Sequence, residues 1–190
     1  MEKVFIPVLL GTGRIDRLSE HAAKFVVSEV GKNEKIETKL IDVKEYGYTV
    51  TVPPWGTGGA DETPTPWKEI MARADGLIIV TPEYNHGYPG ELKMLLDSLY
   101  DEYEKKPVLL CGVSGGGLGG ARMVEHIKPV LIELKMVPMR SALYFSNVKK
   151  LFNTEGTMQE KSQEEVYEKQ VSDALTELLW YAETLKKGRT

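Results

Sequence analysis

The sequence predicts a single doubly wound α/β domain over residues 1–190, with five parallel strands in the order 2-1-3-4-5 and helices on both faces of the sheet. One observation behind this prediction is that short apolar runs alternate with segments of helical period along the chain. Another is that three connecting loops are rich in glycine, proline or arginine, and they follow the first, third and fourth strands. The predicted order sets these three strands side by side, so their loops are expected to meet at one edge of the sheet.

The five predicted strands are mostly apolar on both faces, as buried parallel strands are, and only the second alternates roughly between polar and apolar residues. They are expected at Val4–Leu10, Ile36–Val43, Gly76–Thr81, Lys106–Val113 and Val137–Ser146. The first of them contains Pro7, which removes one donor from the ladder of hydrogen bonds and is an exception inside such a strand.

Helical periodicity appears after each of these strands. Helices are expected at Ala22–Val30, Trp67–Ala74 and Glu91–Tyr103, then around Met123–Leu134, and at Ser162–Lys187. Pro129 is expected to bend or locally break the fourth helix. The apolar stripe expected to pack the last helix on the sheet consists of Val166, Val171, Leu175, Leu178, Ala182 and Leu185. The segments Tyr46–Pro66 and Asn147–Met158 are expected to be irregular, and Trp55 is expected to cover a ligand or line a subunit contact.

Composition narrows the class of protein. The chain is 42% hydrophobic and 27% charged, which is ordinary for a folded soluble domain, and its net charge of −4 gives no indication of a nucleic-acid binder. Cys111 is the only cysteine, so an internal disulfide is excluded. No apolar stretch approaches the roughly 20 residues that a membrane span needs, and the first residues do not resemble a secretion signal. A cytoplasmic location is therefore expected.

The loop after the first strand, Gly11–Ser19, offers the groups that bind a phosphate. Thr12 and Ser19 carry hydroxyls, Arg14 and Arg17 carry guanidinium groups, and a helix N-terminus follows. The alternative is an ordinary helix start with Ser19 as the N-cap and two solvated arginines. The motif is neither a P-loop nor the dinucleotide fingerprint, whose third glycine is missing.

The loop after the third strand, within Thr81–Asp97, is unusually rich in proline and tyrosine. Backbone amides around Glu83–His86 and the Asn85 side chain are expected to bond the edge of a planar ligand, and Tyr84 with the nearby tyrosine and proline is expected to cover it. An ordinary turn is the alternative. His86 is expected to form a hydrogen bond or stack rather than act as an acid catalyst.

The loop after the fourth strand, Ser114–Gly120, has five glycines in seven residues. Glycines let the backbone approach a flat ligand and donate its amides, whereas flexibility or close packing of helix on strand would also explain them. Arg122 either contacts a phosphate of a second nucleotide or lies in solvent. The other candidates have structural explanations: the three histidines lack metal-ligand spacing, so no metal site is expected, and Asp97, Tyr100, Glu102 and Tyr103 are expected on a helix surface.

Together these motifs resemble the NAD(P)H-dependent FMN reductase family, a flavodoxin-like group that includes quinone, azo-dye and chromate reductases. The resemblance rests on three motifs and runs from about Val4 to Ser146. They are Gly11-Thr-x-Arg-x-x-x-x-Ser19; Pro82-Glu-Tyr-Asn85 with Pro89-Gly-x-Leu-Lys-x-x-x-Asp97; and Ser114-Gly-Gly-Gly with Gly119-Gly-Ala-Arg122. The chain departs from the family in having Thr12 where serine is usual, and Glu20-His21 where an asparagine often occurs nearby.

The resemblance implies a non-covalently bound FMN. Its phosphate would lie on Thr12, Arg14, Arg17 and Ser19. Its ring would lie against Pro82, Glu83, Tyr84, Asn85 and His86 on one loop, and against Ser114, Gly115 and Gly116 on the other.

The resemblance also implies an activity and an assembly. NAD(P)H would pass a hydride to N5 of the flavin, and a flavin, quinone or similar small acceptor would then react at the same face in ping-pong turnover, without an obligatory catalytic side chain. A homodimer or dimer of dimers is expected, with the partner chain helping to wall the flavin. A non-enzymatic, flavodoxin-like electron carrier is the alternative, against which Arg14 and the mild negative charge argue.

Overall fold

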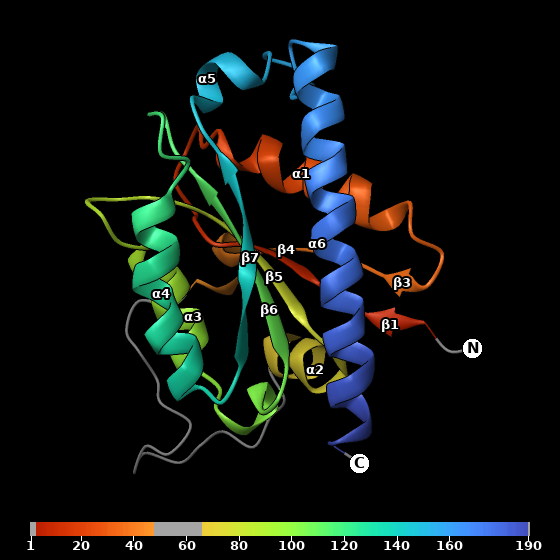
Figure 1. The fold of residues 1–190 in the computed structure, drawn as a ribbon. Helices are drawn as coiled ribbons and strands as arrows, with labels where there is room; N and C mark the ends of the chain where they lie inside the picture. Colours follow the sequence, from red (N-terminus) through yellow and green to blue (C-terminus); the bar gives the residue numbers. More distant parts are fainter. Residues whose placement is uncertain (1–2, 48–65, 190) are drawn as a thin grey trace.

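Five strands form one parallel sheet in the computed structural model, which describes residues 3–47 and 66–189. The sheet order is β4-β2-β5-β6-β7, and every neighbouring pair is parallel (Figure 1). The strands are β2 (Val8–Leu10), β4 (Leu40–Asp42), β5 (Leu77–Pro82), β6 (Pro107–Val113) and β7 (Val137–Phe145). This order is the predicted 2-1-3-4-5 order, so the predicted fold class is confirmed.

The first two predicted strands are each divided in two. β1 (Val4–Phe5) pairs with β3 (Ile36–Glu37) in a small separate ladder, and the main sheet resumes at β2 and β4. At the division the Ile6 and Val8 amides still donate to the second strand at 2.9 Å, but the Ile6 carbonyl accepts from the Thr38 hydroxyl at 2.8 Å. Pro7 faces the other neighbour, β5, where its carbonyl accepts a hydrogen bond from the Ile78 amide at 3.0 Å. The prediction of uninterrupted strands was wrong at this point, because a side-chain hydroxyl takes the Ile6 carbonyl that would accept the next backbone bond of the ladder.

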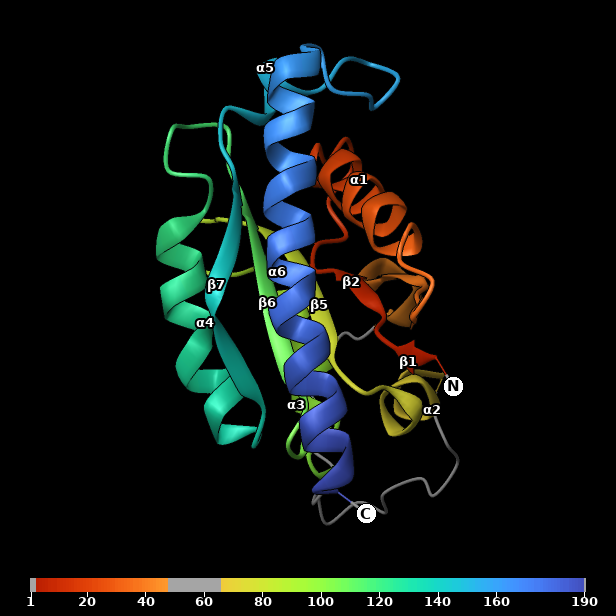
Figure 2. The same cartoon turned by 45° about the vertical axis from the view of Figure 1, so that its right-hand side comes forward.

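Helices cover both faces of the sheet (Figures 1 and 2). α1 (Ser19–Gly31) and α6 (Lys161–Lys187) pack on one face, and α2 (Pro66–Arg73), α3 (Gly90–Asp97) and α4 (Ala121–Glu133) pack on the other. The strand pattern explains the two layers, since alternate residues of a strand point to opposite faces. In β5, Ile78 and Val80 join the first apolar cluster, whereas Leu77 and Ile79 join the second.

Some predicted helices have different limits. α3 ends at Asp97 instead of continuing to Tyr103, and a short 3₁₀ turn, η2 (Asp101–Tyr103), follows. The Ser98 hydroxyl donates to the Leu95 carbonyl at 2.7 Å, a local bond that competes with helix continuation. Tyr103 is fully buried rather than on a helix surface, and its hydroxyl accepts a hydrogen bond from Trp67 Nε1 at 2.8 Å.

Other differences concern α4, α5 and α6. Pro129 lies inside α4, which continues through it as one helix. Pro129 and Glu125, whose carbonyl loses its partner, are both exposed, so the missing bond falls on the solvent side of α4. A short helix, α5 (Val148–Leu151), occupies part of the segment expected to be irregular. On α6, Val166 is 54% exposed and does not join the apolar stripe that packs on the sheet.

Two further elements complete the description. The 3₁₀ turn η1 (Val43–Tyr46) follows β4 directly and begins with the Asp42 carboxylate accepting from the Lys44 amide. Across residues 3–47 and 66–189, no helix has the length and apolarity of a membrane span. Most of the predicted loop Tyr46–Pro66, including Trp55, lies outside the described residues.

Candidate functional site

A cavity of about 310 Å³ opens where the loops after β2, β5 and β6 meet at the carboxyl edge of the sheet. Seven of the predicted site residues line it: Arg14, Ser19, Pro82, Glu83, Tyr84, Ser114 and Gly115. Leu18, Val113, Val148 and Lys149 complete the lining. The convergence of three loops is thus present, because adjacent parallel strands end at the same edge. The five remaining predicted residues, Thr12, Arg17, Asn85, His86 and Gly116, are outside this lining.

Ser19 is the first residue of α1, and its buried hydroxyl forms no hydrogen bond with the described residues. The residue is 3% exposed, and its Oγ has no hydrogen-bond partner among the described residues. Leu18 is the N-cap, and no side chain caps the helix, so the alternative interpretation of Ser19 as an N-cap is wrong. An unsatisfied buried hydroxyl costs about 1–3 kcal/mol. An anion at this helix N-terminus would satisfy it.

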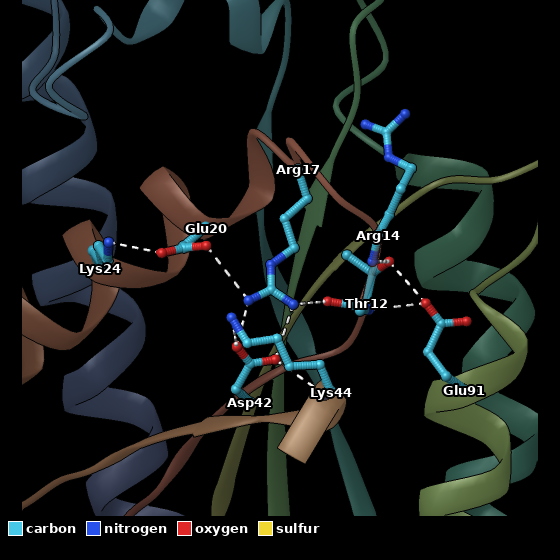
Figure 3. A network of polar contacts seen from close by, with 9 residues as sticks. Thr12, Arg14, Arg17, Glu20, Lys24, Asp42, Lys44 and Glu91 are labelled. Atoms are coloured by element: carbon cyan, nitrogen blue, oxygen red, sulfur yellow. Dashed lines mark hydrogen bonds and ion pairs between the residues drawn. The ribbon is translucent and has the colours of Figure 1, made fainter. Parts of the chain in front are cut away.

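Two cations line the same cavity. Arg14 is exposed, and its guanidinium lies 5.7 Å from the centre of the Tyr84 ring. Figure 3 shows it extending away from the polar groups of its own loop. Lys149, on α5, forms no ion pair with any described residue. Sequence reasoning missed Lys149, although the pair Lys149-Lys150 shortly after the fifth strand was a usable signal.

Arg17 points to the sheet instead of the cavity (Figure 3). Its Nη1 donates to Asp42 Oδ1 at 2.9 Å and to the Thr12 carbonyl, and its Nη2 donates to Asp42 Oδ2 and, at 3.4 Å, to Glu20. Burial by itself raises the pKa of Asp42, but the hydrogen bonds from Arg17 and the Lys44 amide outweigh it and hold that pKa below its ordinary value. The structure therefore places Arg17 as a brace beneath the loop.

The turn that follows β5 is a two-residue hairpin. Tyr84 and Gly87 exchange both backbone hydrogen bonds, each 2.9 Å long. The residues between them, Asn85 and His86, have φ values of +49° and +69°, the geometry of a type I′ turn. Both are exposed at the tip, so the structure does not bring their side chains into the cavity.

The glycine loop divides into two parts with different reasons for glycine. At Gly119, φ is +58° and a Cβ would lie 2.7 Å from Tyr144 Cβ; at Gly120, φ is +83° and a Cβ would lie 2.8 Å from the Val113 amide nitrogen. Close packing and backbone conformation explain these two. At Gly115, Gly116 and Gly117 a Cβ would meet nothing within 4 Å, and φ is not positive. Neither explanation applies there, which favours open space left for a ligand.

Glu83 connects the loop after β5 to α4. Its Oε1 accepts from Arg122 Nε at 2.6 Å, whereas its Oε2 is buried without a hydrogen-bond partner among the described residues. Arg122 is therefore in an ion pair rather than free in solvent.

The described residues contain no cluster of side chains suited to a metal ion. Cys111 is fully buried in β6, and burial raises the pKa of its thiol, so it is an unreactive core residue.

The lining as a whole fits a flat ligand that ends in a phosphate. Two cations line the cavity together with the Ser19 hydroxyl at the start of α1, which has no partner among the described residues, and a stretch of glycine backbone follows in the next wall. This geometry agrees with what the chain is similar to among known proteins.

The family described as NADPH-dependent FMN reductase matches residues 5–150. An NAD(P)H-dependent FMN reductase of Schizosaccharomyces pombe is 35% identical over 146 residues, which are 73% of this chain and 72% of that protein. A quinone reductase of Escherichia coli is 38% identical over 84 residues, 42% of this chain and 45% of that protein. The solved structure of FerB, a flavoenzyme NAD(P)H:(acceptor) oxidoreductase from Paracoccus denitrificans, has a TM-score of 0.72 at 19% identity, covers 97% and 98% of the two chains, and supports the fold alone.

The matched region contains all three loops and the cavity between them. The predictions of the family, of an enzyme, and of FMN and NAD(P)H as cofactors are confirmed by these similarities. The chain belongs to the NADPH-dependent FMN reductase family.

Proposed function

We propose that the chain passes reducing equivalents from NAD(P)H, through FMN held in the 310 Å³ cavity, to a flavin, a quinone or a similar small acceptor. The observation that carries this proposal is the meeting of three different features in one cavity: two cations, a buried hydroxyl without a partner, and glycines that neither packing nor conformation requires. The family and the flavin and quinone reductases among the relatives support it.

The phosphate end of FMN is assigned to the start of α1. Arg14 and Lys149 supply positive charge from two sides, and the Ser19 hydroxyl supplies a donor at the helix N-terminus. Thr12 and Arg17, also predicted as phosphate contacts, have side chains already bonded to Glu91 and Asp42, so the proposal gives them a supporting role.

The ring end is assigned to the two other loops. Ser114 and Gly115 offer a backbone surface free of large side chains, and Gly116 continues it. Pro82, Glu83 and Tyr84 form the facing wall. Asn85 and His86 stay predictions, because their exposed side chains could contact only the outer edge of a ligand.

The described residues hold these walls in place. The Ser114 hydroxyl donates to the Gly116 carbonyl at 2.9 Å, and the Asn147 amide donates to the same carbonyl at 2.9 Å, which fixes the glycine loop against α5. The Glu83–Arg122 pair fixes the facing wall against α4. When bound, FMN supplies the capacity to accept and release a hydride; the chain supplies position and charge.

Ping-pong turnover is part of the proposal, since one open cavity would receive donor and acceptor in turn. Initial rates at several NADPH and quinone concentrations test it. Parallel lines in a double-reciprocal plot are expected, whereas lines that intersect would show that donor and acceptor occupy the protein together.

The assignment of the phosphate end is tested by titrating FMN and riboflavin, which lacks the phosphate, into the same preparations. Arg14→Ala and Lys149→Ala should each cost roughly 1.5–3 kcal/mol of FMN binding, about a 10- to 150-fold loss, with little effect on riboflavin. Lys35→Ala, which removes an exposed charge far from the cavity, is the control. Equal losses for the two flavins would contradict a phosphate contact.

A homodimer or dimer of dimers that walls the flavin from the open side also belongs to this proposal. Two large apolar side chains near the glycine loop, Leu118 and Tyr144, are 56% and 39% exposed, which supports a covered surface there. Light scattering of the purified protein measures the oligomer, and a monomer that still binds FMN would contradict the role of a partner chain.

A further inference from the structure

Glu91 reaches from the first turn of α3 into the loop that follows β2 (Figure 3). Its Oε1 accepts a hydrogen bond from the Thr12 hydroxyl at 2.8 Å and another from the Gly13 amide at 3.0 Å. Glu91 does not line the cavity assigned to FMN, and neither does Thr12, which is fully buried. The carboxylate therefore acts on the loop from beneath.

The direction of the hydrogen bonds follows from the groups involved. A carboxylate only accepts, so the single hydrogen of the Thr12 hydroxyl is used on Glu91. The Tyr84 hydroxyl lies 3.1 Å from Thr12 Oγ1, and it must then be the donor in that contact. The result is a relay in which Tyr84 donates to Thr12 and Thr12 donates to Glu91.

This relay joins two walls of the cavity that are far apart in the sequence. Tyr84 belongs to the loop after β5, and Arg14, whose amide lies 3.4 Å from Thr12 Oγ1, belongs to the loop after β2. The Arg14 guanidinium also lies over the Tyr84 ring. From the other side, Arg17 donates to the Thr12 carbonyl. Thr12 is thus held through its hydroxyl and its carbonyl at once.

We propose that Glu91 is a positioning residue of the FMN site, which fixes Arg14 and Tyr84 relative to each other through Thr12. This inference rests on the proposed function. It differs from a phosphate contact, because loss of Glu91 releases the wall at the ring end together with the wall at the phosphate end.

The test compares Glu91→Ala, Glu91→Gln and Thr12→Val in FMN and riboflavin titrations. Glu91→Gln keeps an oxygen acceptor for the two donors, so its affinities for both flavins should stay within about threefold of the unchanged protein. Glu91→Ala removes the acceptor and should weaken FMN binding about tenfold or more, and riboflavin binding several-fold as well. Glu164→Gln, at a first-turn glutamate of α6 that forms no ion pair within residues 3–47 and 66–189, is the control.

The energetic coupling of Thr12 and Glu91 in FMN binding gives a second readout, which a general loss of folding stability would not reproduce. Thr12→Val removes the middle of the relay with little change of shape, so the double variant with Glu91→Ala should bind FMN no more weakly than the worse single variant. If Glu91→Ala does not fold, Thr12→Val tests the relay by itself: it should weaken the binding of both flavins, and a Thr12→Val protein that binds both flavins normally would overturn the inference.

The inference is overturned if Glu91→Gln loses as much flavin affinity as Glu91→Ala. It is also overturned if the losses of FMN affinity caused by Thr12→Val and Glu91→Ala add up in the double variant. A third contrary result is that Glu91→Ala leaves the affinity for both flavins unchanged while Arg14→Ala weakens FMN binding. That last result would leave the proposed function intact. Unchanged protein that binds neither flavin would overturn the proposed function and this inference with it.

Discussion

At the scale of single residues, the polar side chains beneath the cavity mostly satisfy one another. Arg17 has a side chain only 3% exposed, and it pairs with Asp42, whose side chain is 12% exposed, through two hydrogen bonds. Removing one partner of such a pair leaves an uncompensated charge, which typically costs 3–5 kcal/mol. The pair stabilises the loop that carries Arg14 and Ser19.

Asp42→Asn should lower the free energy of unfolding at pH 7 by about 3 kcal/mol. The pKa of Asp42 is below its ordinary value in the folded protein, because the bonds from Arg17 and Lys44 outweigh burial. Its ionised form therefore adds stability that is fully present above the unfolded pKa of about 3.9 and is lost as the pH falls through the lower folded value. Urea unfolding at several pH values measures this, and the gap between the two proteins should narrow below about pH 4.

Asp173→Asn provides the control, because Asp173 is an exposed residue of α6 whose ion pair among the described residues is with Lys169. It should change stability by less than about 1 kcal/mol at any pH. A gap for Asp42→Asn that stays constant from pH 7 to pH 3 would contradict the role given to the pair.

Residue types were predictable from the sequence, but their partners were not. Thr12, Arg14, Arg17 and Ser19 appeared as four equal phosphate contacts, whereas the structure separates two that line the cavity from two that brace the loop. Asp42 lies on the neighbouring strand, so only the folded sheet shows that it competes for Arg17.

At the scale of elements, the glycine loop contains both structural and permissive glycines. The sequence left flexibility, close packing and ligand approach as open explanations for all five. Packing explains Gly119 and Gly120, while Gly115 lines the cavity with free space around it.

Gly119→Ala should destabilise the protein by about 2 kcal/mol or more, since a Cβ there meets Tyr144 in a left-handed backbone conformation. Gly115→Ala should leave the melting temperature unchanged or slightly higher, and should instead weaken FMN binding, because its Cβ would enter the cavity. Thermal unfolding and FMN titration of both variants measure the two effects. A Gly115→Ala protein with unchanged FMN affinity would remove the glycine loop from the site.

At the hairpin after β5, a substitution should stabilise the protein rather than destabilise it. His86 has φ +69°, which costs a residue with a side chain about 1 kcal/mol and costs glycine nothing, so His86→Gly should raise stability by about 0.5–1 kcal/mol. Ser28→Gly, an exposed position within α1, should lower it by a similar amount. Urea unfolding measures the stability of both variants. A loss of stability in His86→Gly would contradict this prediction and show that the imidazole makes a stabilising contact.

Element order was predictable because the alternation of apolar runs and helical periods is strong, and a parallel sheet follows from it. The first and last residues of the helices and strands were harder to predict from the sequence. The ladder break beside Ile6 and the end of α3 at Asp97 each coincide with a single side-chain bond to a backbone carbonyl, and such a bond has no periodic signal. The short helix α5 has too few residues to show a period.

At the scale of the whole molecule, the two edges of the sheet have different roles. The carboxyl edge holds the cavity, and the amino edge holds the end of α6 (Figure 1). Asp75 lies at the amino edge, accepts from Lys186 at 3.1 Å and from Arg189 at 3.0 Å, and also accepts from the Phe5 amide at 3.2 Å. These contacts fasten the last helix to the start of the sheet.

Lys106 at the same edge is only 5% exposed, and its Nζ donates to the Met71 carbonyl. Burial, together with the nearby Arg189, lowers the pKa of Lys106 to about 8. Because the unfolded chain binds this proton up to a pKa of about 10.4, the stability of the protein should rise with pH between about 8 and 10.4, by about 3 kcal/mol from this group.

Comparison with Lys106→Met isolates that contribution, since the variant lacks the titrating group and all other groups are shared. The stability difference between the two proteins should change across this pH range and stay constant from pH 6 to 7. FMN affinity should not respond to the substitution, because Lys106 lies at the far edge of the sheet from the cavity. A pH-independent difference would contradict the lowered pKa.

Anaerobic stopped-flow mixing of the FMN-loaded protein with NADH or NADPH, followed by mixing with a quinone, measures the proposed oxidoreductase activity at the flavin itself. We expect at least one nicotinamide to bleach the visible absorption of the bound flavin and the quinone to restore it without further nicotinamide. A visible band that neither NADH nor NADPH changes would contradict the assignment of this cavity to a flavin-dependent oxidoreductase.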